Sequence, residues 1–335
     1  MKIASCEISG KEQQAYRFLA GVVTTDCFID LCVAHRALTG NDNHSTIPSS
    51  IVEFLEDGEQ MLMWAQAALT YGRENLNEES PEESITTDGN RLAYHLDEIT
   101  LLPAVPRPGK IIHTSVNFSA HKKEVTAFES SPEWQGQNWG GFHYQHPTGF
   151  LQAPSATVGS HSPVVIPQFT KQLDYEIEIA TIIGKRASNV TEADALDYVA
   201  GYCIFNDMSA RDIQGREHAN KVIMLGKSFD TSCPLGPWLT TKEEISDPQN
   251  LKMELRLNGE LRQDANTSEM IYSIPKLVSW WSQITLEPGD VITSGSPSGV
   301  IAAMPDPVWL ASGDRIEASI EGLDTLVNEI VSSQS

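Results

Sequence analysis

The chain has 335 residues, 40% of them hydrophobic, which suffices for a sizeable core in one large or two smaller domains. Its 23 lysines and arginines stand against 45 aspartates and glutamates, and the resulting formal net charge of −22 disfavours nucleic acid and anionic membrane surfaces as partners. No run of about 18 apolar residues is present, and the N-terminus has no basic and apolar leader. We therefore expect a soluble, cytoplasmic protein that acts on a small molecule.

The first 70 residues contain structural patterns without recognisable chemistry. Apolar runs over residues 18–23 and 28–33 predict strands of a small β-rich module. Ser50 and Glu53 have the spacing of a capping box, and the apolar residues of 51–69 recur with helical spacing around an interruption at Gly58.

The five cysteines are scattered, and their spacing fits neither a CxxC pair nor a zinc site. They stand mostly in apolar, strand-like surroundings. We expect them to be buried small hydrophobic residues of a protein in a reducing compartment.

A change of composition separates two parts of the chain. Residues 73–88 are acidic and polar, and residues 102–109 contain three prolines, which favour an extended linker. We place a domain boundary near Pro108. This predicts an N-terminal domain over 1–107, which ends in the acidic and proline-rich linker, and a second domain over 108–335.

The second domain is predicted to open with a strand over 110–116, followed by a polar helical turn. His121 and Glu124 are three residues apart in that turn, so both side chains lie on one helix face and the carboxylate can orient the imidazole. Taken alone, such a pair is more often a solvated surface pair.

Residues 126–146 carry aromatic side chains spaced by glycines. Such a loop can fold over a ligand and exclude water, or it can be a rigid surface excursion that packs its own aromatic rings, and the pattern favours neither. His143 and His146 have no partner ligands nearby in the sequence, and we interpret them as ordinary polar residues.

Carboxylates recur in the middle of the chain. Residues 174–183 alternate as in a half-buried strand, which places Glu176 and Glu178 on one face, roughly 6.5–7 Å apart. Asp207 follows an apolar strand over 202–205. Three hard carboxylates suit Mg²⁺, Mn²⁺ or Ca²⁺ rather than zinc, and Mg²⁺ is the first choice. The Glu-x-Glu pattern by itself is typical of a solvated face.

The C-terminal third shows a hairpin, a helix and a serine-rich segment. Residues 251–260 alternate and end in Asn-Gly, and residues 272–284 have a helical pattern. The segment 294–300 does not fit GxSxG, because Pro297 stands in the place of the nucleophile. A serine hydrolase is therefore disfavoured.

Five segments, in this order, resemble the fumarylacetoacetate hydrolase family over roughly residues 103–330. They are NFSAHKKE at 117–124, DYEIE at 174–178, NDMSARDIQ at 206–214, GKSFD at 226–230 and SGSPSGV at 294–300. The resemblance implies a mostly β fold with some α. The catalytic domain would be a mixed β-sandwich roll, preceded by a small β-rich N-terminal domain, and the protein would be a homodimer.

The resemblance also assigns roles to single residues. Glu176, Glu178 and Asp207 would be the metal ligands, and His121 with Glu124 would be a water-activating pair on a lid.

Further roles concern the substrate. Lys227 would contact the substrate or its developing enolate charge. Arg211 and Gln214 correspond to substrate-binding positions, although Arg211 has a structural role in smaller acylpyruvase-like relatives. Ser296 stands where the family commonly has threonine.

The sequence also departs from the family pattern. Asn117 stands in place of a fourth metal carboxylate, so the acylpyruvase-like branch with three carboxylates is the better template. Ala120 replaces a common aspartate, Gln152 replaces a common lysine, and the insertion at 126–146 is atypical.

The resemblance implies a Mg²⁺-dependent hydrolase that cleaves a carbon–carbon bond of a 1,3-diketo or acylpyruvate-type 2-oxo acid through a metal enolate. Decarboxylation of an oxaloacetate-type acid is the second reading, and isomerisation or hydration could use the same site. From a different class, the chain could be a catalytically silent binding or assembly module. The retained carboxylates, the His–Glu pair and Lys227 argue against that reading.

Overall fold

Strands dominate the computed structural model, which describes residues 1–8, 15–40, 46–128 and 145–333. The predicted class, mostly β with some α, is confirmed. A 12-stranded sheet has the order β4-β3-β2-β1-β14-β12-β11-β17-β6-β7, with β5 on β1 and β8 on β14. Its strands are β1 Lys2–Ile8, β2 Tyr16–Thr24, β3 Cys27–Asp30, β4 Ala93–His95, β5 Thr100–Leu101, β6 Ile111–Thr114, β7 Gly149–Gln152, β8 Thr157–Val158, β11 Ile177–Ile183, β12 Val199–Asn206, β14 Cys233–Thr241 and β17 Val291–Thr293.

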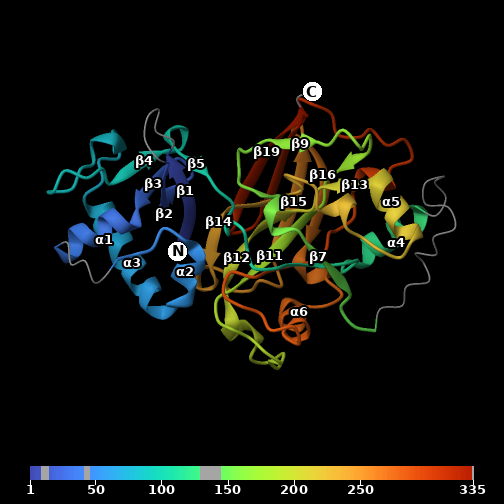
Figure 1. Cartoon of the computed structure of the whole chain (residues 1–335), viewed down its shortest axis with the longest axis horizontal. Helices are drawn as coiled ribbons and strands as arrows, with labels where there is room; N and C mark the ends of the chain where they lie inside the picture. Colours follow the sequence, from blue (N-terminus) through green and yellow to red (C-terminus); the bar gives the residue numbers. More distant parts are fainter. Residues whose placement is uncertain (9–14, 41–45, 129–144, 334–335) are drawn as a thin grey trace.

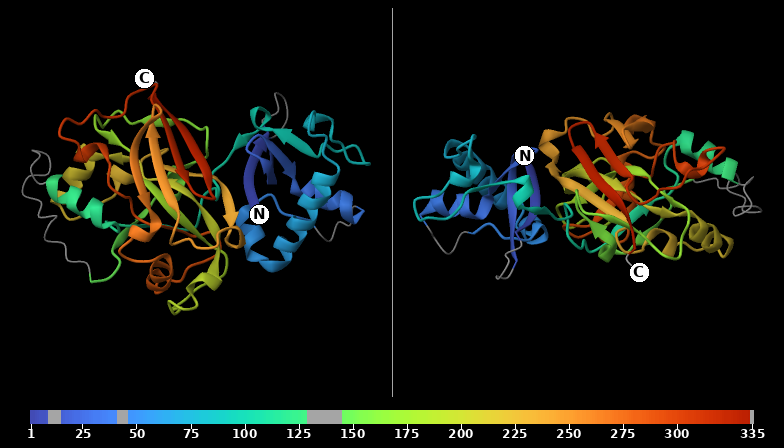
Figure 2. Two further views of the ribbon diagram at one scale, coloured as in Figure 1. Left: turned by 180° about the vertical axis from the view of Figure 1, so that it is seen from behind. Right: turned by 90° about the horizontal axis from the view of Figure 1, so that it is seen from above.

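A second sheet of five strands packs against the large one (Figure 2). In spatial order its strands are β16 Glu260–Asn266, β15 Lys252–Leu257, β18 Arg315–Ile320, β19 Asp324–Ser332 and β9 Val164–Ile166. A short pair joins β10 Leu173–Asp174 to β13 Ser209–Ala210. The largest hydrophobic core lies between the two sheets, where Ile179 and Tyr202 of the large sheet join Leu255 and Ile316 of the smaller one.

The described residues form six α-helices beside the sheets: α1 Leu31–Thr39, α2 Ile51–Glu56, α3 Glu59–Glu74, α4 Ser119–Phe128, α5 Arg211–Ala219 and α6 Ile274–Trp281. In the described part of the chain, none of them is long and apolar enough to cross a membrane. α1, α2 and α3 lie beside β1–β4 at one end of the molecule, whereas α4, α5 and α6 belong to the other end (Figure 1).

β1 connects the two ends of the molecule. It pairs with β2 along its whole length, and its first residues also pair with β14, where Lys2 lies opposite Thr240. The large sheet therefore runs without interruption from the N-terminal strands into the strands after residue 108. The division at 107/108 stays a prediction.

Several local predictions are confirmed. The helical segment after Ser50 is divided into α2 and α3 at Gly58, whose φ of +57° is a left-handed conformation that glycine adopts without a Cβ clash. Asn258 and Gly259 both have positive φ and connect β15 to β16, as an Asn-Gly hairpin turn requires.

The cysteines behave as small buried residues. All five are free, and only Cys32 is partly exposed. Burial raises the pKa of each of them, for Cys233 to about 12, so their thiols are protonated and unreactive at neutral pH.

The strand predicted over 28–33 is wrong beyond Asp30. The Asp30 carboxylate accepts a hydrogen bond from the backbone N–H of Val33 at 3.0 Å and so caps α1, which begins at Leu31. Leu31 belongs to the buried face of this helix with Ala34 and His35, whereas Cys32 and Val33 are half-buried.

The half-buried strand predicted over 174–183 is also wrong. β11 begins at Ile177, which leaves Glu176 in the break after β10, and all seven residues of β11 are buried. Ile177 and Ile179 belong to the core between the sheets, whereas Ala180 and Ile182 belong to the core on the other face. A central strand covered on both faces has no solvated side.

Asp30 provides a test of stability and its pH dependence. Its carboxylate is buried and also accepts a hydrogen bond from the Tyr16 hydroxyl at 2.7 Å. Asp30→Ala is expected to lower the free energy of unfolding by about 1–2 kcal/mol, whereas Asp30→Asn, which retains a capping oxygen, should lose much less.

The pH dependence has a definite sign. Burial raises the pKa of Asp30, so the folded state binds its proton more tightly than the unfolded state does. The bound proton therefore makes its full contribution to the free energy of unfolding at acid pH, and this contribution declines as the pH rises past the carboxyl's usual range. In urea unfolding, the free energy of unfolding of Asp30→Asn relative to that of the wild type should be higher at pH 7.5 than at pH 4. A constant difference would contradict this reading.

Candidate functional site

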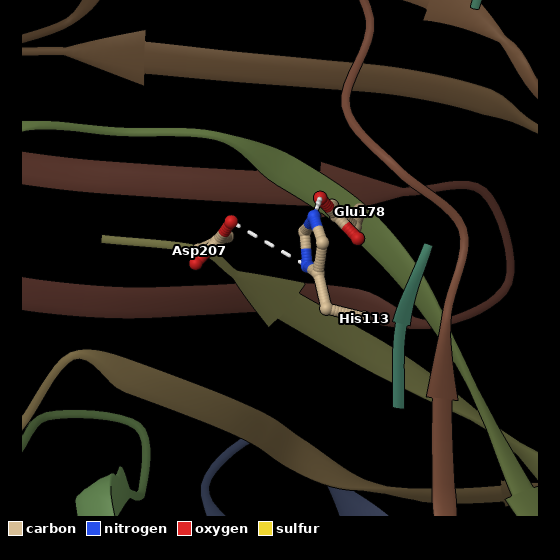
Figure 3. Close-up of side chains that lie close together, drawn as sticks. All are labelled: His113, Glu178 and Asp207. Atoms are coloured by element: carbon tan, nitrogen blue, oxygen red, sulfur yellow. Dashed lines mark ion pairs between the residues drawn. The ribbon is translucent and has the colours of Figure 1, made fainter. Parts of the chain in front are cut away.

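Three buried side chains from separate segments converge beside the central strands of the large sheet. Glu178 lies on β11, Asp207 follows the last residue of β12, and His113 lies on β6. The imidazole of His113 stands between the two carboxylates (Figure 3). In the described part of the chain, these three can each place one ligand atom within 4.8 Å of the other two.

The contacts of His113 define its orientation. Its Nδ1 lies 3.1 Å from the Thr293 hydroxyl and 3.4 Å from Asp207 Oδ2, and its Nε2 lies 3.6 Å from Glu178 Oε1. The ring also packs against Phe150, with 4.6 Å between the ring centroids. Burial, reinforced by the nearby Lys227 charge, lowers the pKa of His113 to about 3. The imidazole is therefore neutral at physiological pH.

Glu178 is held in place by one oxygen only. Its Oε2 accepts a hydrogen bond of 2.8 Å from the backbone N–H of Gly295, whereas Oε1 is buried without a hydrogen-bond partner. Burial raises the pKa of Glu178 well above its usual range, and the neighbouring Asp207 carboxylate adds to that rise. An unpaired oxygen in such a place favours a positive charge nearby.

Lys227 supplies positive charge to the other carboxylates. Its ammonium donates to Glu176 Oε2 at 2.5 Å and to Asp207 Oδ2, and all three groups are buried. Burial alone would lower the pKa of Lys227, but Asp207 and Glu176 outweigh it and raise the value. Burial raises the pKa of Asp207 to about 7, although the ammonium opposes this rise.

Gln152, at the end of β7, fixes Asp207 from the other side. Its side-chain amide donates to Asp207 Oδ1 at 2.7 Å and to the Lys227 carbonyl at 2.9 Å. The amide oxygen of Gln152 is buried without a partner. The residue at this position is therefore a neutral donor that orients Asp207 without adding charge.

Arg211 holds Glu176 through a buried guanidinium that donates from each of its three nitrogens. It donates from Nε to Asp174 at 2.8 Å, from Nη2 to Glu176 Oε1 at 2.7 Å, and from Nη1 to Gln214 at 3.0 Å. Burial favours a neutral Glu176, but Arg211 and Lys227 outweigh it and hold the pKa of this carboxyl well below its usual range. Glu176 is therefore ionised and has two cationic partners.

His121 and Glu124 form the pair predicted on α4. His121 Nδ1 lies 3.0 Å from Glu124 Oε2, and the other Glu124 oxygen accepts the backbone N–H of Gly299 at 2.8 Å. His121 Nε2 points toward the carboxylates and lies 3.8 Å from Glu176 Oε1. His121 is buried, so the pair is not a solvated surface pair.

The structure thus brings six of the predicted site residues close to one another: His121, Glu124, Glu176, Glu178, Asp207 and Lys227. Arg211 joins them through Glu176, and Gln214 joins through Arg211. Ser296, the residue after Gly295, is buried, and its hydroxyl accepts a hydrogen bond from the Gln263 side-chain amide at 3.0 Å. Substrate contacts of Arg211, Gln214 and Ser296 stay predictions.

Two residues of the cluster are not among the predicted site residues. His113 lies in the strand predicted over 110–116, and Gln152 stands only as a departure from the family pattern. The available signal for His113 is an imidazole that directly follows two isoleucines in β6. The predicted aromatic loop lies almost entirely outside the described residues, as does His143. His146 is described, and its ring stacks on Trp280 with 4.6 Å between the centroids.

The residues fit a divalent cation. Carboxylate oxygens and an imidazole nitrogen are the ordinary ligands of such ions, and the unpartnered Glu178 oxygen lies among them. His121 and Glu124 lie beside these residues, so the arrangement places a pair that can exchange protons next to a candidate cation site.

The comparisons identify the family. Residues 110–331 match the model of the fumarylacetoacetate (FAA) hydrolase C-terminal domain. The chain therefore belongs to the fumarylacetoacetate hydrolase family, whose members include hydrolases, isomerases and tautomerases.

Relatives match along nearly the whole chain. Oxaloacetate tautomerase YisK of Bacillus subtilis is 35% identical over 98% of this chain and 100% of its own length. Mitochondrial oxaloacetate tautomerase FAHD2B of Bos taurus is 37% identical over 85% of this chain and 81% of its own. Among solved structures, maleylpyruvate hydrolase from Sphingobium sp. SYK-6, in complex with manganese(II) and pyruvate, has 29% identity and a TM-score of 0.70 and covers both chains completely.

Proposed function

We propose that this protein is a divalent-cation-dependent tautomerase that interconverts the keto and enol forms of a small 2-oxo dicarboxylic acid of the oxaloacetate type. The observation that carries the proposal is the direction of His121 Nε2, which faces the buried carboxylates at 3.8 Å while Glu124 holds the opposite nitrogen. A proton-transfer group thus lies beside a cation site. The similarity to named oxaloacetate tautomerases over most of the chain supports the choice of reaction.

Glu176, Glu178 and Asp207 would hold the cation, which when bound would polarise the substrate carbonyl as a Lewis acid. In the keto-to-enol direction, His121 Nε2 accepts a proton from C3 of the substrate and the Glu124 carboxylate stabilises the imidazolium. The C3 electron pair forms the C2–C3 double bond, and the carbonyl oxygen takes up the proton from the His121 imidazolium, which gives the enol and restores the neutral ring. Lys227, whose ammonium donates to Glu176 and Asp207, would offset the negative charge that develops on that oxygen.

The proposal includes finer expectations about ion and assembly. The carboxylates alone favour Mg²⁺, with Mn²⁺ or Ca²⁺ as the alternatives. We also propose a cytoplasmic homodimer, as the family resemblance implies. Light scattering coupled to size-exclusion chromatography would measure the molar mass directly.

Carbon–carbon hydrolysis of an acylpyruvate-type acid is the second candidate. The same His121–Glu124 pair can take a proton from water, and the similarity to maleylpyruvate hydrolase favours this reading. Hydroxide would add to the distal carbonyl, the carbon–carbon bond would break with its electron pair on the 2-oxo acid fragment, and that carbon would then take up a proton. Decarboxylation would also leave an enolate but needs no water.

One substrate panel separates these reactions. Metal-free protein, with and without added Mg²⁺ or Mn²⁺, is assayed by NMR with oxaloacetate enol, acylpyruvates and fumarylpyruvate. We expect cation-dependent acceleration of enol-to-keto conversion, lowered by about 10²–10⁴-fold in His121→Ala. His146→Ala, which removes an imidazole stacked on Trp280, is the matched control.

The other outcomes are equally distinct. Cleavage of an acylpyruvate into two acids, without faster tautomerisation, would establish the hydrolase instead, and carbon dioxide release would establish the decarboxylase. Turnover that persists unchanged in EDTA would contradict the cation dependence. No turnover of any substrate with any cation would favour the catalytically silent module.

A further inference from the structure

We propose that His113 is a nitrogen ligand of the cation site, so that this protein selects a first-row transition-metal ion over Mg²⁺. The inference rests on the cation dependence of the proposed function and goes beyond it, because it concerns which ion binds and through which atoms. The sequence pattern suggested a site of three carboxylates, whereas the structure places an imidazole between two of them.

The distances around His113 do not suit direct hydrogen bonds. Charge-assisted N–H···O bonds to carboxylates are about 2.7–2.9 Å long. The ring nitrogens of His113 lie 3.4 Å from Asp207 and 3.6 Å from Glu178, and the Glu178 oxygen that faces Nε2 has no hydrogen-bond partner. Two ligand atoms that are each about 2.1 Å from one ion lie roughly 3–3.5 Å apart. The 3.6 Å between His113 Nε2 and Glu178 Oε1 is close to the spacing of two ligands that share an ion.

Thr293 determines which nitrogen of His113 is free. The Thr293 hydroxyl lies 3.1 Å from Nδ1, and Asp207 Oδ2 lies 3.4 Å from the same nitrogen. A ligating imidazole carries one ring proton, and we assign it to Nδ1, because both of these oxygens can accept from it, whereas Nε2 faces Glu178 Oε1 at the longer distance of 3.6 Å. When Glu178 is ionised, the Nε2 lone pair then faces Oε1 with no hydrogen between them. Two buried lone pairs in this arrangement repel each other unless a cation lies between them.

The same contact is typical of metal-binding histidines. Such residues usually donate their second ring N–H to a neighbouring acceptor, which fixes both the tautomer and the ring plane. Thr293 provides that acceptor, and Phe150 packs against the ring and restricts its rotation. His113 is therefore positioned before any ion binds, and its ring need not reorient to coordinate one.

Ligand chemistry then predicts the ion. Carboxylates suit Mg²⁺, Ca²⁺ and Mn²⁺, whereas an imidazole ligand adds affinity for transition-metal ions, increasingly from Mn²⁺ to Co²⁺ and beyond. Mg²⁺ requires oxygen ligands and gains little from a nitrogen. Adding an imidazole to the carboxylate ligands therefore raises the preference for Co²⁺ or Mn²⁺ over Mg²⁺.

The test is a calorimetric titration of metal-free full-length protein with CoCl₂, MnCl₂ and MgCl₂. His113→Ala is expected to weaken Co²⁺ binding by about 10–100-fold or more, at least the loss caused by removing an outer-shell partner, and to change Mg²⁺ affinity by less than about threefold. His113→Gln preserves side-chain volume and offers an oxygen, so it controls for a folding defect in His113→Ala. It should lower the ratio of Co²⁺ affinity to Mg²⁺ affinity in the same way. His146→Ala should bind like the wild type.

Pulsed electron paramagnetic resonance of the Mn²⁺-loaded protein gives a readout independent of turnover. Nitrogen modulation from a bound imidazole is expected in the wild type and should disappear in both His113 variants. Equal Co²⁺ affinity in His113→Ala and wild type, or a wild-type spectrum without nitrogen coupling, would overturn this inference while leaving the proposed function intact. A wild type that binds none of the three ions would overturn the cation dependence itself.

Discussion

Glu178→Gln is expected to abolish tight binding of a divalent cation and to lower turnover by about 10²–10³-fold, the effect of losing several kcal/mol of carbonyl polarisation. The substitution preserves the shape of the side chain and the acceptor for the Gly295 N–H. It replaces the unpartnered Oε1, the Glu178 oxygen that faces His113 Nε2 at 3.6 Å. The measurement is calorimetric titration with Mn²⁺ alongside the tautomerase assay.

Stability distinguishes a lost ligand from a damaged fold. Glu178 and Asp207 are two buried carboxylates close to one another, so removing one of them should leave the metal-free protein as stable as the wild type or more so. In the wild type, added cation should raise the melting temperature, and in Glu178→Gln it should not. Asp290→Asn, in a buried carboxylate that pairs with Lys110, is the matched control and should retain the cation-induced rise. Tight Mn²⁺ binding by Glu178→Gln would show that Glu178 is not a ligand.

Arg211→Met is expected to lower the free energy of unfolding by about 3–5 kcal/mol, because it leaves the buried Asp174 carboxylate without its cation and Glu176 with Lys227 alone. Asp174 and Glu176 each accept a hydrogen bond from one nitrogen of the Arg211 guanidinium, and all three side chains are buried. Asp174 also accepts backbone N–H groups from Ile301 and Ala302. The destabilisation should therefore extend beyond the site to the segment after β17.

Comparison variants separate structural from substrate-binding roles of Arg211. Arg211→Lys keeps the charge but not the planar fork, so its stability should lie between those of the wild type and Arg211→Met. Arg216 lies on the same helix, α5, and is exposed, so Arg216→Met should change stability by less than about 0.5 kcal/mol. Urea unfolding measures all three variants. An Arg211→Met protein with normal stability and a raised KM would favour the substrate contact instead.

Local patterns predicted much of the secondary structure. The Asn-Gly turn, the break at Gly58 and the His121–Glu124 spacing depend on residues within one turn or one helix, where backbone preference and periodicity decide the outcome. Prediction failed where tertiary contacts determine the result. Asp30 capped a helix inside an apolar run, and β11 was buried on both faces although its sequence alternates.

The candidate site shows the same division. Glu176, Glu178 and Asp207 could be proposed from carboxylate spacing and from the family motifs. The sequence did not distinguish their surroundings. Glu176 has both its oxygens bound by Lys227 and Arg211, whereas Glu178 retains an unpartnered oxygen. These differences arise from contacts across 35 to 51 positions of sequence, which no local window contains.

The sequence by itself determined the family, the carboxylate and histidine groups available for chemistry, and the order in which they occur. Only the tertiary structure decided which of them meet. The order β12-β11-β17-β6 places Asp207, Glu178, Thr293 and His113 on neighbouring strands, although 180 residues separate His113 from Thr293. Strand order depends on how distant segments bury their apolar faces together, and periodicity within one strand contains no information about its neighbours. His113 therefore became a candidate ligand only once β6 was placed beside β17.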